Sequence, residues 1–87
     1  MIGIEYSSHF VRKYTKLHPD LKKEVFVRIE EFKDPTNHRK LEVHKLKDAM
    51  AGQWAFSVNY HDRVAFEYSK DKKIAYLLDV GDHTIYR

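Results

Sequence analysis

The sequence contains no cysteine among its 87 residues. This absence excludes disulfide bonds, thiolate metal sites and a cysteine nucleophile. It is also typical of proteins in a reducing compartment, so we expect a cytoplasmic location. No apolar run approaches the roughly 20 residues that cross a bilayer. Because Glu5 and Ser7 interrupt the apolar start, we expect neither a membrane segment nor a signal peptide.

Internal repeats, low-complexity tracts and linkers are also absent. We therefore expect one domain that spans residues 1–87. What the chain does have is core-forming material, because 43% of its residues are hydrophobic and 14% are aromatic. A globular chain of this size buries roughly 60% of its unfolded surface, which is enough for it to fold alone.

Positive charge is concentrated in one segment of the chain. The formal net charge is +3, and residues 33–47 alone hold five Lys or Arg side chains against two acidic ones. A local basic patch indicates contact with phosphate better than the overall charge does. We therefore expect Arg39, Lys40, Lys45 and Lys47 to contact phosphate groups, such as those of a nucleic-acid backbone. The alternative is a solvated loop.

Hydrophobic periodicity predicts a strand followed by a helical hairpin. Residues 2–6 alternate between apolar and other residues, as in a strand. A serine pair supplies an N-cap for a helix over about 8–17, and Pro19 opens a second helix that ends before Asp34. The irregular segment 34–53 is predicted to be a long loop.

After this loop the apolar period becomes two, which predicts a three-stranded antiparallel meander. Turns at 61–63 and 69–73 keep the apolar residues on one face. The residues predicted on this core face are Trp54, Phe56, Val58, Tyr60, Val64, Phe66, Tyr68, Ile74, Tyr76, Leu78 and Val80. The other face is either solvated or a shallow groove, because its side chains are small or polar. They include Ala55, Ser57, Asn59, Ala65, Glu67 and Asp79.

Helices and strands that do not alternate along the chain indicate the α+β class. We therefore predict an N-terminal strand, an α-helical hairpin and a three-stranded antiparallel meander. The helices should pack on one face of a four-stranded sheet, which leaves the small, polar face to hold a site.

The end of the chain carries the most distinctive pattern. An apolar strand stops at Gly81, and His83 and Tyr86 follow within five residues. Histidine accepts or gives a proton near neutral pH because its ordinary pKa is about 6.5, so His83 is a candidate acid or base. The structural alternative is a surface histidine in a turn. The six histidines lack the spacing of known metal ligands, so we expect no metal.

Three segments carry a resemblance to a known family. They are His44-x-Leu46, then Gly52-x-Trp54-x-Phe56-Ser57-Val58-Asn59-Tyr60-x-x-Arg63, then Leu77-Leu78-Asp79-Val80-Gly81-Asp82-His83 with a near-terminal tyrosine. In this order and spacing, the chain resembles toxins of the RelE/ParE superfamily of type II toxin–antitoxin systems over essentially its whole length. The closest likeness is to the YafQ-like RelE group.

The resemblance implies a function. RelE-like members are metal-independent endoribonucleases that enter the ribosomal decoding site and cut mRNA, and a cognate antitoxin wraps and silences each of them. The resemblance therefore implies an mRNA interferase without a cofactor, partnered by an antitoxin and by mRNA on the ribosome. It also implies catalytic or RNA-contacting roles for His44, Asp62, His83 and Tyr86, and contact of Arg63 with the scissile phosphate.

The chemistry of metal-free RNA cleavage fits these residue types. A base must take the 2′-hydroxyl proton, cations must stabilise the charged phosphate, and an acid must protonate the leaving 5′-oxygen. Histidines suit the first and last steps, and an arginine fork suits the phosphate. The structural alternatives are an ion pair of Arg63 with Asp62 or Glu67 and a core position for Tyr86.

Two other functions stay open. ParE-like members share the fold but inhibit DNA gyrase and cut no RNA, and an inactive member would only bind its antitoxin. The stretch between Lys47 and Arg63 contains no Lys or Arg, where RelE-like strands carry lysines, and this favours the alternatives. His83 and Tyr86 favour the nuclease, because a pure gyrase inhibitor needs no proton-transfer groups.

Overall fold

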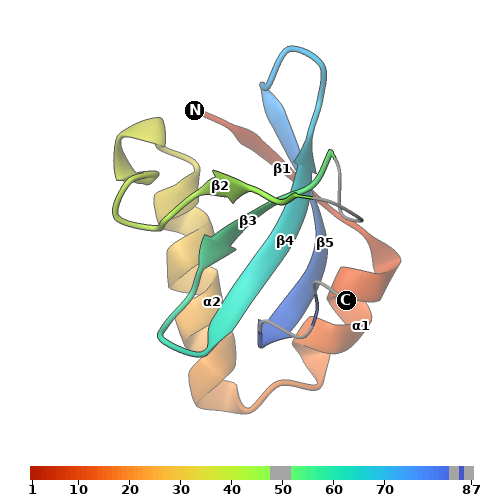
Figure 1. The fold of residues 1–87 in the computed structure, drawn as a ribbon. Coiled ribbons are helices and arrows are strands. Elements are labelled where there is room, and N and C mark those ends of the chain that lie inside the picture. Colours follow the sequence, from red (N-terminus) through yellow and green to blue (C-terminus); the bar gives the residue numbers. More distant parts are fainter. Residues whose placement is uncertain (48–51, 83–84, 86–87) are drawn as a thin grey trace.

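The computed structural model describes residues 1–47, 52–82 and 85. Their elements, in chain order, are β1 (Gly3–Tyr6), α1 (Ser8–Thr15), α2 (Pro19–Phe32), the 3-10 helix η1 (Pro35–Asn37), β2 (His44–Lys45), β3 (Trp54–Ser57), β4 (Asp62–Tyr68) and β5 (Ile74–Asp82). The strands form one sheet in the order β1-β5-β4-β3-β2 (Figure 1). β1 is parallel to β5, and the other neighbours are antiparallel.

The predicted α+β class and the helical hairpin are confirmed, but the predicted strand count was one too low. The segment read as a long loop contains β2, which pairs its two residues with β3. A two-residue strand is too short to show a period, so the sequence pattern could not reveal it. In the described part of the chain, no helix is long and apolar enough to cross a membrane.

Both helices begin where the capping residues predict. The Ser7 side chain accepts a hydrogen bond from Phe10 N at the start of α1, and Pro19 occupies the first turn of α2. α1 ends at Thr15 rather than near Leu17, because Lys16 N and Leu17 N turn back to carbonyls three residues earlier. The hairpin is therefore tight, and α1 packs against β5.

The core lies between α2 and one face of the sheet. The core-facing side of α2 carries Val25, Ile29 and Phe32, which recur at helical spacing and are buried. The Phe32 ring stacks on Phe56 at 4.7 Å and meets Phe66 edge-on at 4.8 Å between ring centroids. α2 therefore covers the face that carries Phe56 and Phe66, and the opposite face of the sheet is turned away from it (Figure 1).

The register between β3 and β4 confirms one prediction and corrects another. Trp54 pairs with Phe66 and Phe56 with Val64, so their apolar side chains share the core face as predicted. The turn lies at 58–61, however, and not at 61–63. Tyr60 is therefore in the turn and 90% exposed, and its predicted core position was wrong.

The predicted core face of β5 was wrong over the first half of the strand. Ala65 pairs with Asp79 but Phe66 pairs with Leu77, so one residue of β5 is left over in a bulge. A one-residue shift exchanges the two faces. Ala75 and Leu77 are consequently buried, whereas Tyr76 is 38% exposed. Beyond the bulge, the side chains of β5 alternate between the two faces as predicted, and Val80 is buried.

Candidate functional site

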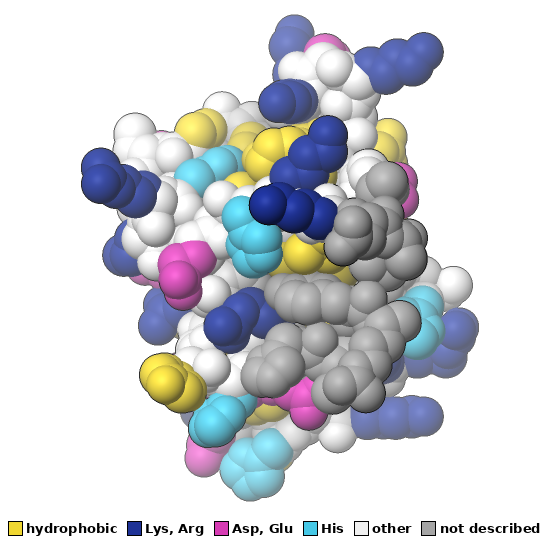
Figure 2. Space-filling view, in the orientation of Figure 1, with side chains coloured by type: hydrophobic (Ala, Val, Ile, Leu, Met, Phe, Trp, Pro, Cys, Tyr) yellow, Lys and Arg dark blue, Asp and Glu magenta, His cyan; other side chains and the backbone are white. Residues whose placement is uncertain are grey.

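Strand register builds two rows of side chains on the face turned away from α2. Residues that lie directly opposite in antiparallel strands project to the same face. The first row is His44, Ala55, Ala65 and Asp79. The second row, two residues along, is Ser57, Arg63 and Gly81. This register brings His44 and Arg63 to one face, which Figure 2 shows with Lys, Arg and His side chains spread across it.

The spacing between His44 and Arg63 suits a ligand that lies between them. They stand two strands and two residues apart, so their Cα atoms are roughly 12 Å from one another. The two alanines of the first row form the floor between them, and both are buried, although this face was predicted to be solvated or grooved.

The His44 ring is oriented by its own turn. Its Nδ1 lies 2.8 Å from the Glu42 carbonyl oxygen, on exposed residues at the edge of the sheet. A carbonyl oxygen only accepts hydrogen bonds, so Nδ1 carries the proton of the neutral ring. The other nitrogen, Nε2, then holds the lone pair that can accept a proton.

Glu42 was not among the predicted site residues, yet it joins both rows. Its φ of 56° lies in the left-handed region, which is uncommon for a residue other than glycine. This conformation aims the carbonyl oxygen at the His44 ring. The carboxylate Oε1 accepts a hydrogen bond of 3.0 Å from Ser57 Oγ, the neighbour of Arg63 in the second row. No sequence pattern signals a left-handed glutamate.

Arg63 is held by carbonyl oxygens rather than by carboxylates. Its Nη1 donates to the carbonyls of Asn59 at 2.9 Å and Asp62 at 3.1 Å. Within residues 1–47, 52–82 and 85, the ion pairs do not include Arg63 and its hydrogen bonds use Nη1 alone. The predicted alternative of an ion pair with Asp62 or Glu67 was therefore wrong. The rest of the guanidinium fork keeps donors for an anion.

The structure does not bring every predicted residue to this face. Asp62 is the strand neighbour of Arg63, so its side chain projects to the opposite face, and its main chain pairs with Asp82. His83 follows Asp82 in the sequence, but His83 and Tyr86 lie outside the described residues. The structure therefore places the end of β5 beside Arg63 and leaves the last two predictions untested.

The four predicted RNA-binding residues surround β2. Arg39 and Lys40 lie in the turn that precedes it, Lys45 is its second residue, and Lys47 follows it, and all four are exposed. Lys40 differs from the others because its Nζ lies 2.6 Å from Glu31 Oε2. Across the ranges that the structure covers, no cluster of three or more His, Cys, Asp or Glu side chains is placed to hold a metal ion.

Comparison with known proteins identifies the architecture. No family model and no curated protein matches the sequence. Solved structures do match. The toxin–antitoxin complex RelBE2 from Mycobacterium tuberculosis gives a TM-score of 0.71 at 16% identity over 93% of this chain and 96% of that chain. The intact RelBE complex from E. coli gives 0.72 at 12% identity, over 94% and 96%. YafQ from E. coli gives 0.69 at 18% identity, over 99% and 98%.

The chain has the RelE-like toxin fold. The resemblance predicted from the sequence is thereby confirmed for the fold, including its likeness to YafQ. In this RelE-like fold, the face that carries His44 and Arg63 is the one turned away from α2, and α1 reaches it at Asp79.

Two residues of α1 reach this RelE-like sheet and were missed by sequence reasoning. Lys13 Nζ lies 2.9 Å from Asp79 Oδ1, and His9 Nε2 lies 3.2 Å from the same oxygen. The two are four residues apart and so share one face of the helix, a spacing that could have signalled them. They fasten α1 to β5 beside Gly81 and fix the strand end that leads to His83.

Gly81 is predicted to be intolerant of a side chain. Its φ is 158°, and an added Cβ would lie 3.0 Å from Ile85 Cγ2 and 3.2 Å from Lys13 Nζ. Gly81→Ala should therefore lower the free energy of unfolding by about 1–3 kcal/mol, measured by urea denaturation. Gly3→Ala is the matched control, because the atoms nearest to a Cβ at Gly3 would lie at 3.6 Å, an ordinary van der Waals contact. Equal losses in both variants would contradict the predicted contact.

Proposed function

We propose that this protein is the toxin of a type II toxin–antitoxin system and that it cleaves mRNA on the ribosome without a metal ion. The observation that carries the proposal is the placement of His44 and Arg63 on one face of the sheet, turned away from α2, with the His44 ring oriented through Nδ1. A base and a phosphate ligand at this spacing are two of the three groups that metal-free cleavage requires.

The proposed roles of His44 and Arg63 follow from their geometry, and those of His83 and Tyr86 follow from the resemblance. His44 Nε2 takes the proton of the 2′-hydroxyl, and the free donors of Arg63 bind the scissile phosphate as charge develops on it. His83 gives a proton to the leaving 5′-oxygen, and Tyr86 contacts a nucleotide base. Asp62 acts through its main chain, because its carbonyl oxygen holds Arg63 Nη1.

The basic residues around β2 are proposed to bind the RNA backbone beside the cleaved bond. Arg39, Lys45 and Lys47 are exposed there, and Lys40 contributes one end of its ion pair with Glu31. Phosphate contacts of this kind release counterions, so binding should weaken as salt rises. They also compensate for the absence of Lys and Arg from β3.

The antitoxin partner is proposed to bind on the other side of the molecule. An apolar pocket of about 230 Å³ lies between the helices and β1, lined by Tyr6, Phe10, Val11, Tyr14, Phe26 and Ile29. Val11 and Phe26 are 45% and 56% exposed, although large apolar side chains are normally buried. An apolar segment of the antitoxin would cover them without touching the RNA face.

A charged side chain introduced into this pocket should weaken binding of the antitoxin without changing RNA cleavage. Phe26→Asp is expected to weaken antitoxin binding by about 30-fold or more, because it places a carboxylate in an apolar contact. RNA cleavage should not change. Val27→Asp is the control, since Val27 is the next residue of α2 and 47% exposed but does not line the pocket. Equal effects on antitoxin affinity, measured by calorimetry, would contradict this surface.

One experiment distinguishes the proposed function from its alternatives. The protein is expressed briefly in growing bacteria, and the 5′ ends of messages are mapped. Codon-phased cuts that disappear in His44→Ala and in His83→Ala support the nuclease. Intact messages together with DNA damage would instead indicate a ParE-like gyrase inhibitor. Intact messages and undamaged DNA would indicate a member that only binds its antitoxin.

A further inference from the structure

A hollow distinct from the apolar pocket adjoins the candidate site at the edge of β3. It has a volume of about 690 Å³, within the roughly 300–1,000 Å³ of small-molecule sites. Its lining includes Arg28, Lys40, Glu42, Ser57, Tyr60 and Arg63. Three of these side chains are cationic and one is anionic, but Arg28 and Lys40 are both paired with Glu31, so Arg63 supplies the positive charge that favours an anion. Because Arg63 belongs to both places, the hollow continues from the proposed phosphate position.

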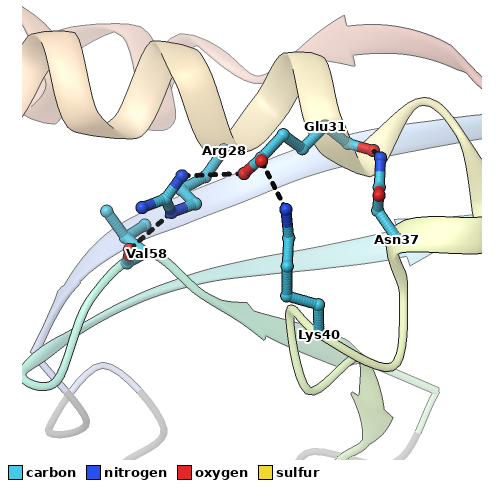
Figure 3. A network of polar contacts seen from close by, with 5 residues as sticks. All are labelled: Arg28, Glu31, Asn37, Lys40 and Val58. Atoms are coloured by element: carbon cyan, nitrogen blue, oxygen red, sulfur yellow. Dashed lines mark hydrogen bonds and ion pairs between the residues drawn. The ribbon is translucent and has the colours of Figure 1, made fainter.

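Arg28 and Lys40 form one wall of the hollow, and their ion pairs with Glu31 hold them in position. Arg28 Nη1 lies 2.7 Å and Lys40 Nζ 2.6 Å from the two oxygens of Glu31, and Arg28 Nε donates to the Val58 carbonyl at 3.0 Å (Figure 3). The Lys40 ammonium, together with the Arg28 guanidinium, holds the pKa of the Glu31 carboxyl below its usual range. In Figure 3 the side chain of Glu31 lies between the two cations and joins α2 to the turn before β2.

The turn that presents Tyr60 is equally constrained. Asn59 Oδ1 accepts hydrogen bonds from the main-chain N–H groups of His61 and Asp62, and Asn59 Nδ2 donates to Glu24 on α2 at 2.6 Å. Arg63 Nη1 binds the Asn59 carbonyl. A turn anchored to α2 and to Arg63 holds the Tyr60 ring at the rim of the hollow, where it is 90% exposed.

We infer that this hollow is a nucleotide subsite, in which the base of an RNA nucleotide next to the cleaved bond stacks on Tyr60. The neighbouring phosphate is bound by Arg63, beside the ion-paired side chains of Arg28 and Lys40. A flat aromatic face beside a cation is an arrangement that binds single-stranded nucleic acid without reading its sequence. The inference rests on the proposed nuclease function and adds a residue that positions the substrate.

The test measures how the Tyr60 ring affects binding of the RNA substrate. A defined message bound to ribosomes is cleaved by the wild-type protein, by Tyr60→Ala and by Tyr60→Trp, and KM and kcat are measured separately. Tyr60→Ala should raise KM by about 5- to 150-fold, the value of one base stack, and leave kcat within about threefold. Tyr60→Trp should restore KM. Tyr76→Ala is the control, because Tyr76 is a partly exposed tyrosine on β5 that lines neither this hollow nor the apolar pocket.

Messages with a single abasic nucleotide then locate the base. At one position beside the cleaved bond, loss of the base should raise KM for the wild-type protein but have no further effect on Tyr60→Ala. If no position shows this coupling, or if Tyr60→Ala cleaves as the wild type does, the subsite is wrong while the nuclease stands. If the wild-type protein cuts no RNA, the proposed function itself fails, and the subsite fails with it.

Discussion

Replacing His44 with alanine is expected to lower RNA cleavage by about 10²–10⁴-fold, the usual contribution of a general acid or base. The expectation follows from the hydrogen bond that leaves Nε2 as the proton acceptor on the face that carries Arg63. Because His44 is exposed on a two-residue edge strand, its loss should change the free energy of unfolding by only about 0.5 kcal/mol. Single-turnover cleavage of a ribosome-bound message measures the first effect, and urea denaturation the second.

A second histidine provides the control for this result. His18 is also exposed, but it caps the N-terminus of α2 through a hydrogen bond to Asp20 N and lies outside the rows of the site face. His18→Asn keeps a capping side chain and should cleave at the wild-type rate. Full activity in His44→Ala would remove the base from the proposed mechanism.

The largest effect on stability is expected for Phe32→Ala. The Phe32 side chain is fully buried, and its ring contacts Phe56, Phe66 and His38 at centroid distances of 4.7, 4.8 and 4.6 Å. Truncation of a phenylalanine in such a cluster typically costs about 3–5 kcal/mol through lost burial and a residual cavity. Urea denaturation followed by circular dichroism measures the loss.

The matched control for this truncation lies on the same helix. Phe26 is 56% exposed, so Phe26→Ala should cost about 1 kcal/mol or less. A loss in Phe26→Ala as large as that in Phe32→Ala would mean that the assignment of the core face of α2 is wrong.

Much of the fold could be predicted because it depends on local patterns. The spacing of Val25, Ile29 and Phe32 identifies the core-facing side of a helix. Ser7 and Pro19 mark the starts of α1 and α2. The alternation of β3 and β4 likewise fixes which side chains share the core. These signals need only a few neighbouring residues, so a single sequence carries them.

The errors arise where pairing overrides local pattern. The bulge beside Ala65 exists only in the contact between β4 and β5, and it moves Leu77 to the core and Tyr76 to the surface. The position of Tyr60 was wrong for a related reason. The turn begins at residue 58, three residues before the predicted loop, and the hydrogen bonds of Asn59 to His61 N and Asp62 N close it. The alternation of apolar residues nevertheless continues through this turn as far as Tyr60, so the pattern did not reveal it.

The candidate site was predictable in its residue types but not in its geometry. His44 and Arg63 could be named from the resemblance, but only the register of β2, β3 and β4 shows that they share a face. The same register turns the Asp62 side chain away. Glu42 could not be foreseen, because its role depends on a left-handed backbone and on a hydrogen bond to Ser57, fifteen residues along the chain.

The most direct test of the proposed chemistry is the cleavage of a ribosome-bound message with 2′-deoxyribose at the cleaved nucleotide. His44 can act as a base only on a 2′-hydroxyl, so the proposed mechanism predicts no cleavage of this message. The all-ribose message should yield a 2′,3′-cyclic phosphate and a 5′-hydroxyl end. Cleavage of the deoxy-substituted message, or 5′-phosphate ends on the normal one, would contradict the proposed mechanism, because both would mean that water rather than the 2′-oxygen attacks the phosphate.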